Sequence, residues 1–151
     1  MIQRIQSLYL LVVSLFYFLY WFFGFEFYEK GYKVIESDLG SISSFFFSFT
    51  SILPLLIAII CFISLLLFKK RSIQIIFSTI ALYISIFMSV YTIIYFSFTI
   101  DNLMADMQST LMELLLYAAI LNPFFSNYLI LLAIKSIKKD EKLVRGEGLI
   151  R

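Results

Sequence analysis

The chain has 151 residues, of which 62% are hydrophobic and 15% are charged, and its formal net charge is +2. Soluble domains average roughly 45–50% apolar and about 25% charged residues, so this composition argues against a soluble domain and favours an integral membrane protein. The sequence has no histidine and a single cysteine, Cys61. The commonest metal ligand and general base are therefore absent, and an intrachain disulfide is excluded.

Four apolar segments are predicted to cross the membrane, at about residues 8–25, 45–68, 73–100 and 114–134. About 20 residues in a helix cover the ~30 Å hydrocarbon core at a rise of ~1.5 Å per residue. We expect these segments to form a single all-α domain over residues 1–134, an antiparallel bundle of four transmembrane helices. Residues 135–151 then form a charged tail.

The first apolar segment follows a short stretch with one basic residue, Arg4, so a cleaved signal peptide is a competing interpretation. The length of the segment and the lack of a small-x-small cleavage site favour a retained span. Tyr17, Tyr20 and Trp21 lie near its far end and fit an aromatic belt at the outer membrane interface.

The segment between the first two spans, residues 26–44, is polar and contains the turn-like sequence Glu29-Lys30-Gly31. β-Branched and aromatic residues on both sides of this turn favour a short outer β-hairpin. The alternative is an irregular loop on the headgroups.

Small and hydroxyl-bearing residues recur at helical spacing in the two middle spans. The second span carries Ser51, Pro54, Ala58 and Cys61. The third span carries Ser78, Ala81, Ser85, Ser89 and Thr92. Small residues let helices approach closely in lipid, so we expect these two faces to pack together. A polar pore lining is the functional alternative.

The segment of residues 101–113 is predicted to begin a surface helix that Asp101 caps. It carries three carboxylates: Asp101, Asp106 and Glu113. At the outer face these groups could hold a divalent ion for chemistry on a lipid-linked substrate, but a solvated loop explains them more simply.

The fourth span contains both amides found inside the spans, Asn122 and Asn127, together with Pro123 and Ser126. Pro123 cannot donate a backbone hydrogen bond, so a kink is expected there. Interhelical hydrogen bonds favour a structural role for the amides, and a binding site at Asn122 is the alternative. Asn127 is predicted to face away from Asn122, where a second protein could contact it.

The distribution of basic residues predicts the orientation. The triplet Lys69, Lys70 and Arg71 joins the second and third spans, and together with Arg4 and the tail it brings ten Lys and Arg residues to one side. The other side has two, Lys30 and Lys33. By the positive-inside rule, both termini are cytoplasmic.

Charged residues of the two termini are candidates for contacts with a cytoplasmic partner or with anionic lipid. They are Arg4, Lys138, Lys139, Asp140, Glu141, Lys142 and Arg145.

Both termini carry a family resemblance. The opening MIQRIQSLYL and the segment KKDEKLVR at residues 138–145 resemble the DUF4293 family, four-span inner-membrane proteins of unknown function from Bacteroidota. Residues 146–151 depart from the family pattern. The resemblance implies a bacterial cytoplasmic membrane and brings no catalytic residue. Because both matched segments lie on the predicted cytoplasmic side, Arg4 and Gln3 are candidates to contact Asp140 and Glu141.

These observations favour a non-enzymatic accessory protein that interacts with other membrane proteins, or with further copies of itself, in the bilayer. The alternative is a small oligomeric transporter or channel that uses the third-span hydroxyls and Asn122-Pro123. No cofactor, metal or nucleic-acid partner is expected.

Overall fold

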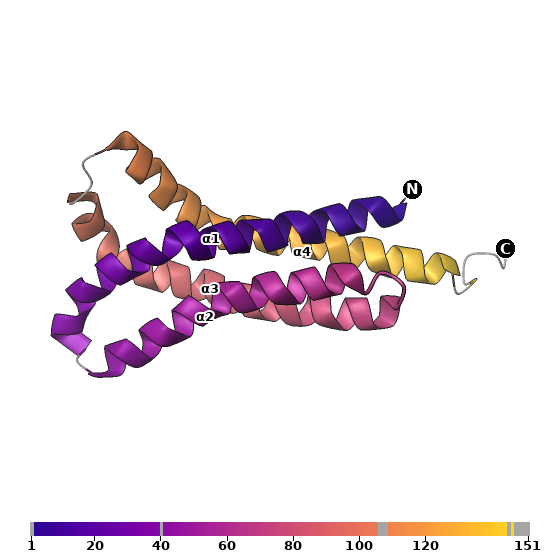
Figure 1. Cartoon of the computed structure of the whole chain (residues 1–151), viewed down its shortest axis with the longest axis horizontal. Coiled ribbons are helices and arrows are strands. Elements are labelled where there is room, and N and C mark those ends of the chain that lie inside the picture. Colours follow the sequence, from indigo (N-terminus) through magenta and orange to yellow (C-terminus); the bar gives the residue numbers. More distant parts are fainter. Residues whose placement is uncertain (1, 40, 106–108, 145, 147–151) are drawn as a thin grey trace.

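The computed structural model of the chain describes residues 2–39, 41–105, 109–144 and 146, with the side chains of residues 5–32, 51–105, 109–142 and 146. These residues form four α-helices and no strand: α1 (Ile2–Leu39), α2 (Ser41–Leu66), α3 (Arg71–Ala105) and α4 (Thr110–Val144). The helices lie side by side along the long axis of the molecule (Figure 1). The start of α1, the α2–α3 turn and the end of α4 lie together at what we name the terminal end. The end of α1, the start of α2, the end of α3 and the start of α4 lie at the opposite, distal end.

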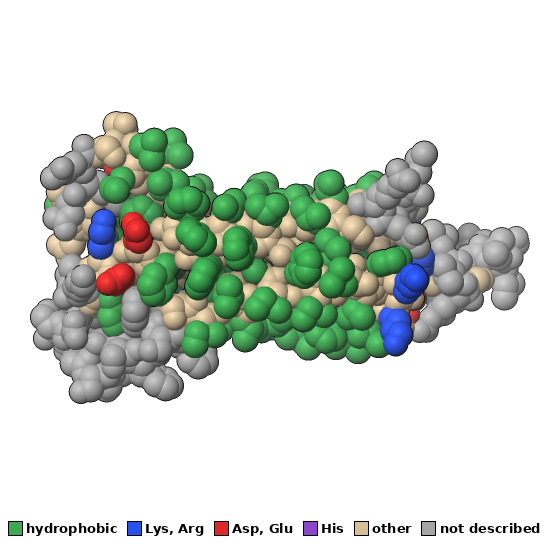
Figure 2. All heavy atoms as spheres, in the orientation of Figure 1, with side chains coloured by type: hydrophobic (Ala, Val, Ile, Leu, Met, Phe, Trp, Pro, Cys, Tyr) green, Lys and Arg blue, Asp and Glu red, His purple; other side chains and the backbone are tan. Residues whose placement is uncertain are grey.

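Three of the helices contain segments long and apolar enough to cross a membrane, at Ile5–Tyr32, Arg71–Ala105 and Thr110–Lys142. The described side chains of α2 add a shorter apolar segment, Ser51–Leu66. Hydrophobic side chains cover the face seen in Figure 2, and the charged side chains in that view lie at its two ends. This distribution is typical of a protein whose sides contact hydrocarbon and whose ends contact water.

All four helices bury residues at alternating spacings of three and four. In α1 the buried positions include Gln6, Leu10, Val13, Tyr17, Tyr20, Gly24, Phe27 and Gly31. In α3 they include Gln74, Ser78, Ala81, Ser85, Met88, Thr92, Tyr95 and Thr99. In α4 they include Leu116, Ala119, Pro123, Ser126, Ile130, Ala133, Ile137 and Asp140. A mean spacing of 3.5 residues is the pattern of left-handed helix packing, in soluble coiled coils and in membrane bundles alike.

The predicted β-hairpin at residues 26–44 is wrong, because α1 continues as a helix through Leu39. Gly31, which the sequence suggested as a turn, is instead a point of close helix contact. A Cβ atom at Gly31 would lie 2.3 Å from the Tyr95 hydroxyl and 3.2 Å from Thr99 Cβ. A glycine is needed there because α3 leaves no room for a side chain.

The two helix ends around residues 101–113 also differ from the prediction. Asp101 lies inside α3, which ends at Ala105, and the cap of α4 is Ser109. The amide of Met112 donates to the Ser109 hydroxyl at 3.4 Å, as expected for an N-cap residue. At the other end, α4 runs ten residues past the predicted span end at Ile134, to Val144. The backbone φ of Gly146 is 75°, a conformation that favours glycine after a helix.

Candidate functional site

The polar face of α3 lies inside the bundle. Ser78, Ala81, Ser85 and Thr92 are completely buried, and Ser89 is nearly so. The buried face continues along α3 with further polar side chains, Gln74, Tyr95 and Thr99. We name this row of residues the hydroxyl column. It runs along most of the described length of α3, so the question is whether its hydroxyls have partners.

Tyrosines of α1 contact the middle and the distal part of the hydroxyl column. Tyr17 shares a hydrogen bond with Ser85, at 2.5 Å between the two oxygens. Tyr20 donates to the Tyr28 hydroxyl at 2.5 Å. Tyr28 and Thr92 share a 3.1 Å bond, and the Thr92 hydroxyl also donates to the Met88 carbonyl at 2.7 Å. Because Thr92 has already given its hydrogen to Met88, Tyr28 is the donor to Thr92. The chain of donors therefore runs Tyr20, Tyr28, Thr92 and ends on the α3 backbone.

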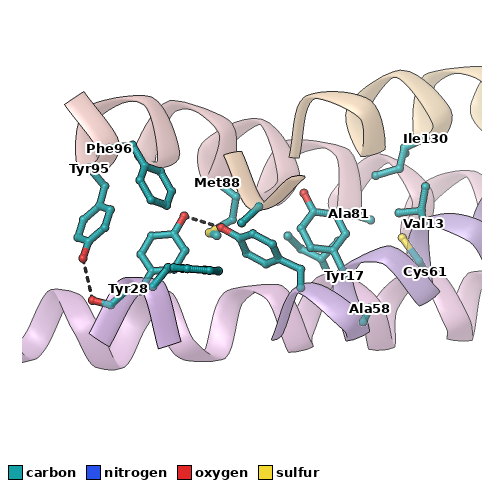
Figure 3. Packing of buried hydrophobic residues seen from close by; sticks show 14 of the residues in the cluster. Val13, Tyr17, Tyr28, Ala58, Cys61, Ala81, Met88, Tyr95, Phe96 and Ile130 are labelled. Carbon is teal, nitrogen blue, oxygen red and sulfur yellow. Dashed lines mark hydrogen bonds between the residues drawn. The ribbon is translucent and has the colours of Figure 1, made fainter. Parts of the chain in front are cut away.

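This arrangement corrects the aromatic belt predicted for α1. Tyr17 is fully buried and Tyr20 is 5% exposed, so neither side chain faces the membrane interface. Figure 3 shows Tyr17 and Tyr28 pointing into the bundle among Met88, Phe96 and Ala81. Their large rings fill the space that the small α3 residues leave, and each hydroxyl finds a partner there, as a buried tyrosine requires.

A second aromatic contact joins the distal parts of α1 and α3. The Tyr95 hydroxyl donates to the Tyr28 backbone carbonyl at 2.7 Å, the left-hand dashed line in Figure 3. The Tyr28 and Tyr95 rings lie 4.7 Å apart, and Phe96 packs against both. The close approach at Gly31 makes this contact possible.

The small residues of α2 contact two different helices, α1 and α3. Ala58 and Cys61 are buried, and the Ala58 carbonyl accepts a hydrogen bond from Ser14 of α1 at 3.0 Å. Ser64 joins α2 to α3: it pairs with Ser78 at 2.8 Å and donates to the Gln74 carbonyl at 3.2 Å. Ser51 is half-buried and also has an interaction partner. The packing prediction missed Ser64 because it followed the small residues only as far as Cys61.

The polar residues of α4 face two neighbours. The Asn122 amide donates to the Phe16 carbonyl of α1 at 3.3 Å, and Ser126 donates to the Asn122 side chain at 3.3 Å. Asn127 instead donates to Ser89 of α3 at 2.7 Å. It therefore faces inward, which corrects its predicted exposure to a second protein. Helix α4 continues through Pro123, and Pro123 is buried.

A groove lies between α1 and α4 in the distal half of the bundle. Its volume is about 440 Å³, and its walls are almost entirely apolar. Phe16, Phe23 and Gly24 are among its α1 residues, and Ala119 and Asn122 are among its α4 residues. Pro123, one turn after Ala119, cannot donate a hydrogen bond to the Ala119 carbonyl.

The terminal end is joined by an ion pair that the sequence analysis did not predict. Arg71 Nη2 lies 3.1 Å from Asp140 Oδ2, and Arg71 Nη1 donates to the Asp140 backbone carbonyl at 2.9 Å. Next to it, Ser72 donates to Glu141 at 3.0 Å, and Gln6 of α1 donates to the Ser136 carbonyl at 3.0 Å. Asp140 thus pairs with α3. The Arg4 side chain and Arg145 lie outside the described residues.

The remaining predicted site residues at this end are exposed. They are Lys69, Lys70, Lys138, Lys139 and Lys142. At the distal end Asp101 and Glu113 are exposed too, and Asp106 lies outside the described residues. Within the described part of the chain, no three Cys, Asp or Glu side chains come together as a metal site requires.

Fold and surface together define an all-α protein with helices of membrane-spanning length. A family model, described as a domain of unknown function (DUF4293), matches residues 2–147, nearly the whole chain. The chain therefore belongs to this family, as its two termini suggested. No curated protein and no solved structure matches the chain.

Proposed function

We propose that this protein is a non-enzymatic accessory protein of a bacterial inner membrane, with four spans and both termini in the cytoplasm. In this role it associates with other membrane proteins through its membrane-facing surface. The proposal rests on one observation: the buried hydroxyls of α3 form hydrogen bonds with other side chains of the same chain. Ser78, Ser85, Ser89 and Thr92 each share a hydrogen bond with a side chain of another helix.

The same hydrogen bonds bear on the transport alternative. A pathway along the hydroxyl column needs hydroxyls that can face a solute, and in one copy of the chain Tyr17, Tyr28, Ser64 and Asn127 occupy them. A conduit would therefore have to form between copies. The outer surface, by contrast, carries the groove between α1 and α4, where a side chain of a neighbouring span can enter.

The charge distribution supports the proposed orientation. The terminal end holds Lys69, Lys70 and Arg71 with the basic residues of α4, and the distal end holds Glu26 and Glu29 with Lys30. The bundle geometry thus gathers at one end the basic segments that the positive-inside rule assigns to the cytoplasm.

The direct test is native purification in a mild detergent or polymer nanodisc, followed by mass measurement of the intact particle. We expect a stoichiometric membrane-protein partner. Ala118→Trp, which fills the groove from its α4 wall, should remove that partner. The matched control is Val90→Trp, at an exposed apolar position on α3.

A lone monomer in every mild condition contradicts the accessory role. A homo-oligomer without other proteins shifts the conclusion to transport, provided that solute flux in liposomes is lost in Ser85→Leu and Asn122→Leu.

A further inference from the structure

A row of lysines covers one face of the last turns of α4. The four residues are spaced i, i+3, i+4 and i+7, so their side chains project from the same side of the helix. They are Lys135, Lys138, Lys139 and Lys142, and all four are exposed. We name this row the lysine stripe.

The opposite face of the same turns packs into the bundle. Ile134, Ile137 and Asp140 are buried there, and the Arg71–Asp140 ion pair fixes this part of α4 against the start of α3. The end of α4 is therefore held at a defined orientation, with its lysines pointing away from the other helices.

The nearby carboxylates offset only part of the positive charge of the lysine stripe. Asp140 contacts Arg71, and Glu141 accepts a hydrogen bond from Ser72. In the part of the chain that the structure describes, none of the four lysines has a carboxylate partner. Lys69 and Lys70, exposed in the neighbouring α2–α3 turn, add positive charge at the same end.

The length of α4 sets the depth of the lysine stripe. Its 35 residues extend about 52 Å at ~1.5 Å per residue, whereas a bilayer with its headgroup regions is about 40–45 Å thick. The last turns of α4 therefore reach the level of the headgroups when the apolar part of the helix crosses the hydrocarbon. Clustered Lys and Arg residues at this depth attract anionic lipid.

We propose that the lysine stripe binds the headgroups of anionic phospholipids in the leaflet at the terminal end. The inference rests on the proposed membrane setting but not on the proposed partner. We assign anionic phospholipids as the ligand because the stripe is positively charged. At the level of the headgroups, the available anions are phosphodiester groups whose lipid carries no compensating positive charge.

The test uses the full chain in nanodiscs that contain dioleoyl phosphatidylcholine with graded dioleoyl phosphatidylglycerol. Native mass spectrometry then counts the phosphatidylglycerol molecules retained by the released protein. Replacing all four stripe lysines with glutamine should weaken phosphatidylglycerol retention at least about tenfold, since each basic residue near a charged surface contributes roughly fivefold. Replacing all four with arginine should preserve retention.

The matched control is Lys30→Gln, an exposed lysine at the distal end with Glu26 and Glu29 nearby. It should change retention by less than about twofold. The proposal is overturned if the fourfold glutamine variant retains phosphatidylglycerol like the unmodified chain, or if Lys30→Gln loses as much. It is also overturned if the glutamine variant loses a protein partner while lipid retention stays constant. Failure of the chain to enter nanodiscs contradicts the proposed membrane function instead.

Discussion

The two halves of the bundle are held together by different chemistry. From mid-length to the distal end, bulky tyrosines of α1 lie against small hydroxyl residues of α3, and hydrogen bonds join them. In the terminal half, Leu10, Ala133 and Ile137 form an apolar cluster, and the Arg71–Asp140 ion pair closes its end. A hydrogen bond between Ser64 and Ser78 joins α2 to α3 there. The distal half depends on exact fit in the interior, whereas the terminal half depends on charge near its surface.

The difference follows from the solvent around each region. In hydrocarbon, apolar side chains gain little from leaving lipid, so helices associate through close packing and hydrogen bonds. The α3 hydroxyls and α1 tyrosines provide both. At the membrane surface water is available and an ion pair can hold helix ends, as Arg71 and Asp140 do while remaining 18% and 12% exposed.

The substitution expected to destabilise the distal half most is Gly31→Ala. The new Cβ meets the Tyr95 hydroxyl at 2.3 Å, and overpacking of a filled interior costs about 1–3 kcal/mol. We expect a loss of about 3 kcal/mol in the free energy of unfolding in detergent, with a lower Tm. Adding Tyr95→Phe removes the clashing oxygen, so the double variant should be more stable than the sum of the single effects predicts. Full additivity would show that the two residues do not meet.

The corresponding destabilising substitution in the terminal half is Arg71→Gln. It leaves the partly buried Asp140 carboxylate without its cation. Loss of one partner of a fully buried pair costs ~3–5 kcal/mol, and partial exposure of this pair lowers our expectation to about 2 kcal/mol. Arg71→Lys keeps the charge but loses the fork that contacts both the carboxylate and the carbonyl, so it should be intermediate. Thermal unfolding of the three forms at low salt measures the order. Equal stability of all three would contradict the role assigned to the ion pair.

A finer test of the distal half compares two phenol-to-phenyl changes. Tyr28→Phe removes the donor to Thr92 and the acceptor for Tyr20, whereas Tyr20→Phe removes one bond at the start of the chain. Interhelical hydrogen bonds in membranes average ~0.6 kcal/mol, and the Tyr20–Tyr28 bond lies within α1. We therefore expect a loss of about 1 kcal/mol for Tyr28→Phe and of about 0.5 kcal/mol or less for Tyr20→Phe. The reverse order in chemical unfolding would contradict the assignment of two hydrogen bonds to the Tyr28 hydroxyl.

The smallest effect belongs to the lipid-facing surface. Phe98 is 73% exposed, so Phe98→Leu exchanges one apolar surface for another and should alter stability by less than about 0.5 kcal/mol. A large loss in detergent would mean that this side chain packs against protein, either a second copy or a partner.

The sequence allowed the four helices to be predicted, because a long apolar segment that crosses a membrane has few stable structures other than a helix. It did not reveal the α1 face, although Tyr17, Tyr20, Gly24, Tyr28 and Gly31 follow the same three-four-four-three spacing as the α3 residues. The tyrosines fit a membrane belt because they stand beside Trp21, and Gly31 fits a turn because it follows Glu29-Lys30. At both places the helical periodicity, and not the local composition, indicates the observed structure.

Contacts between residues far apart in the sequence cannot be predicted from it for a different reason. Arg71 and Asp140 are 69 positions apart, and each lies in a basic or mixed segment with several other candidate partners. Which of these residues pair depends on how α3 and α4 are oriented about their own axes in the bundle. Asn127 was misplaced for the same reason, since α4 has neighbours on two sides and a polar residue on either face can be interior.

The central claim is a four-span protein with its terminal end in the cytoplasm, and cysteine accessibility in intact cells tests it most directly. Cys61→Ala removes the single native thiol, and Lys30→Cys or Lys139→Cys then places one exposed thiol at either end. The account predicts that a membrane-impermeant maleimide labels Lys30→Cys from outside, and Lys139→Cys only after the inner membrane is opened. Labelling of both positions from the same side would contradict it.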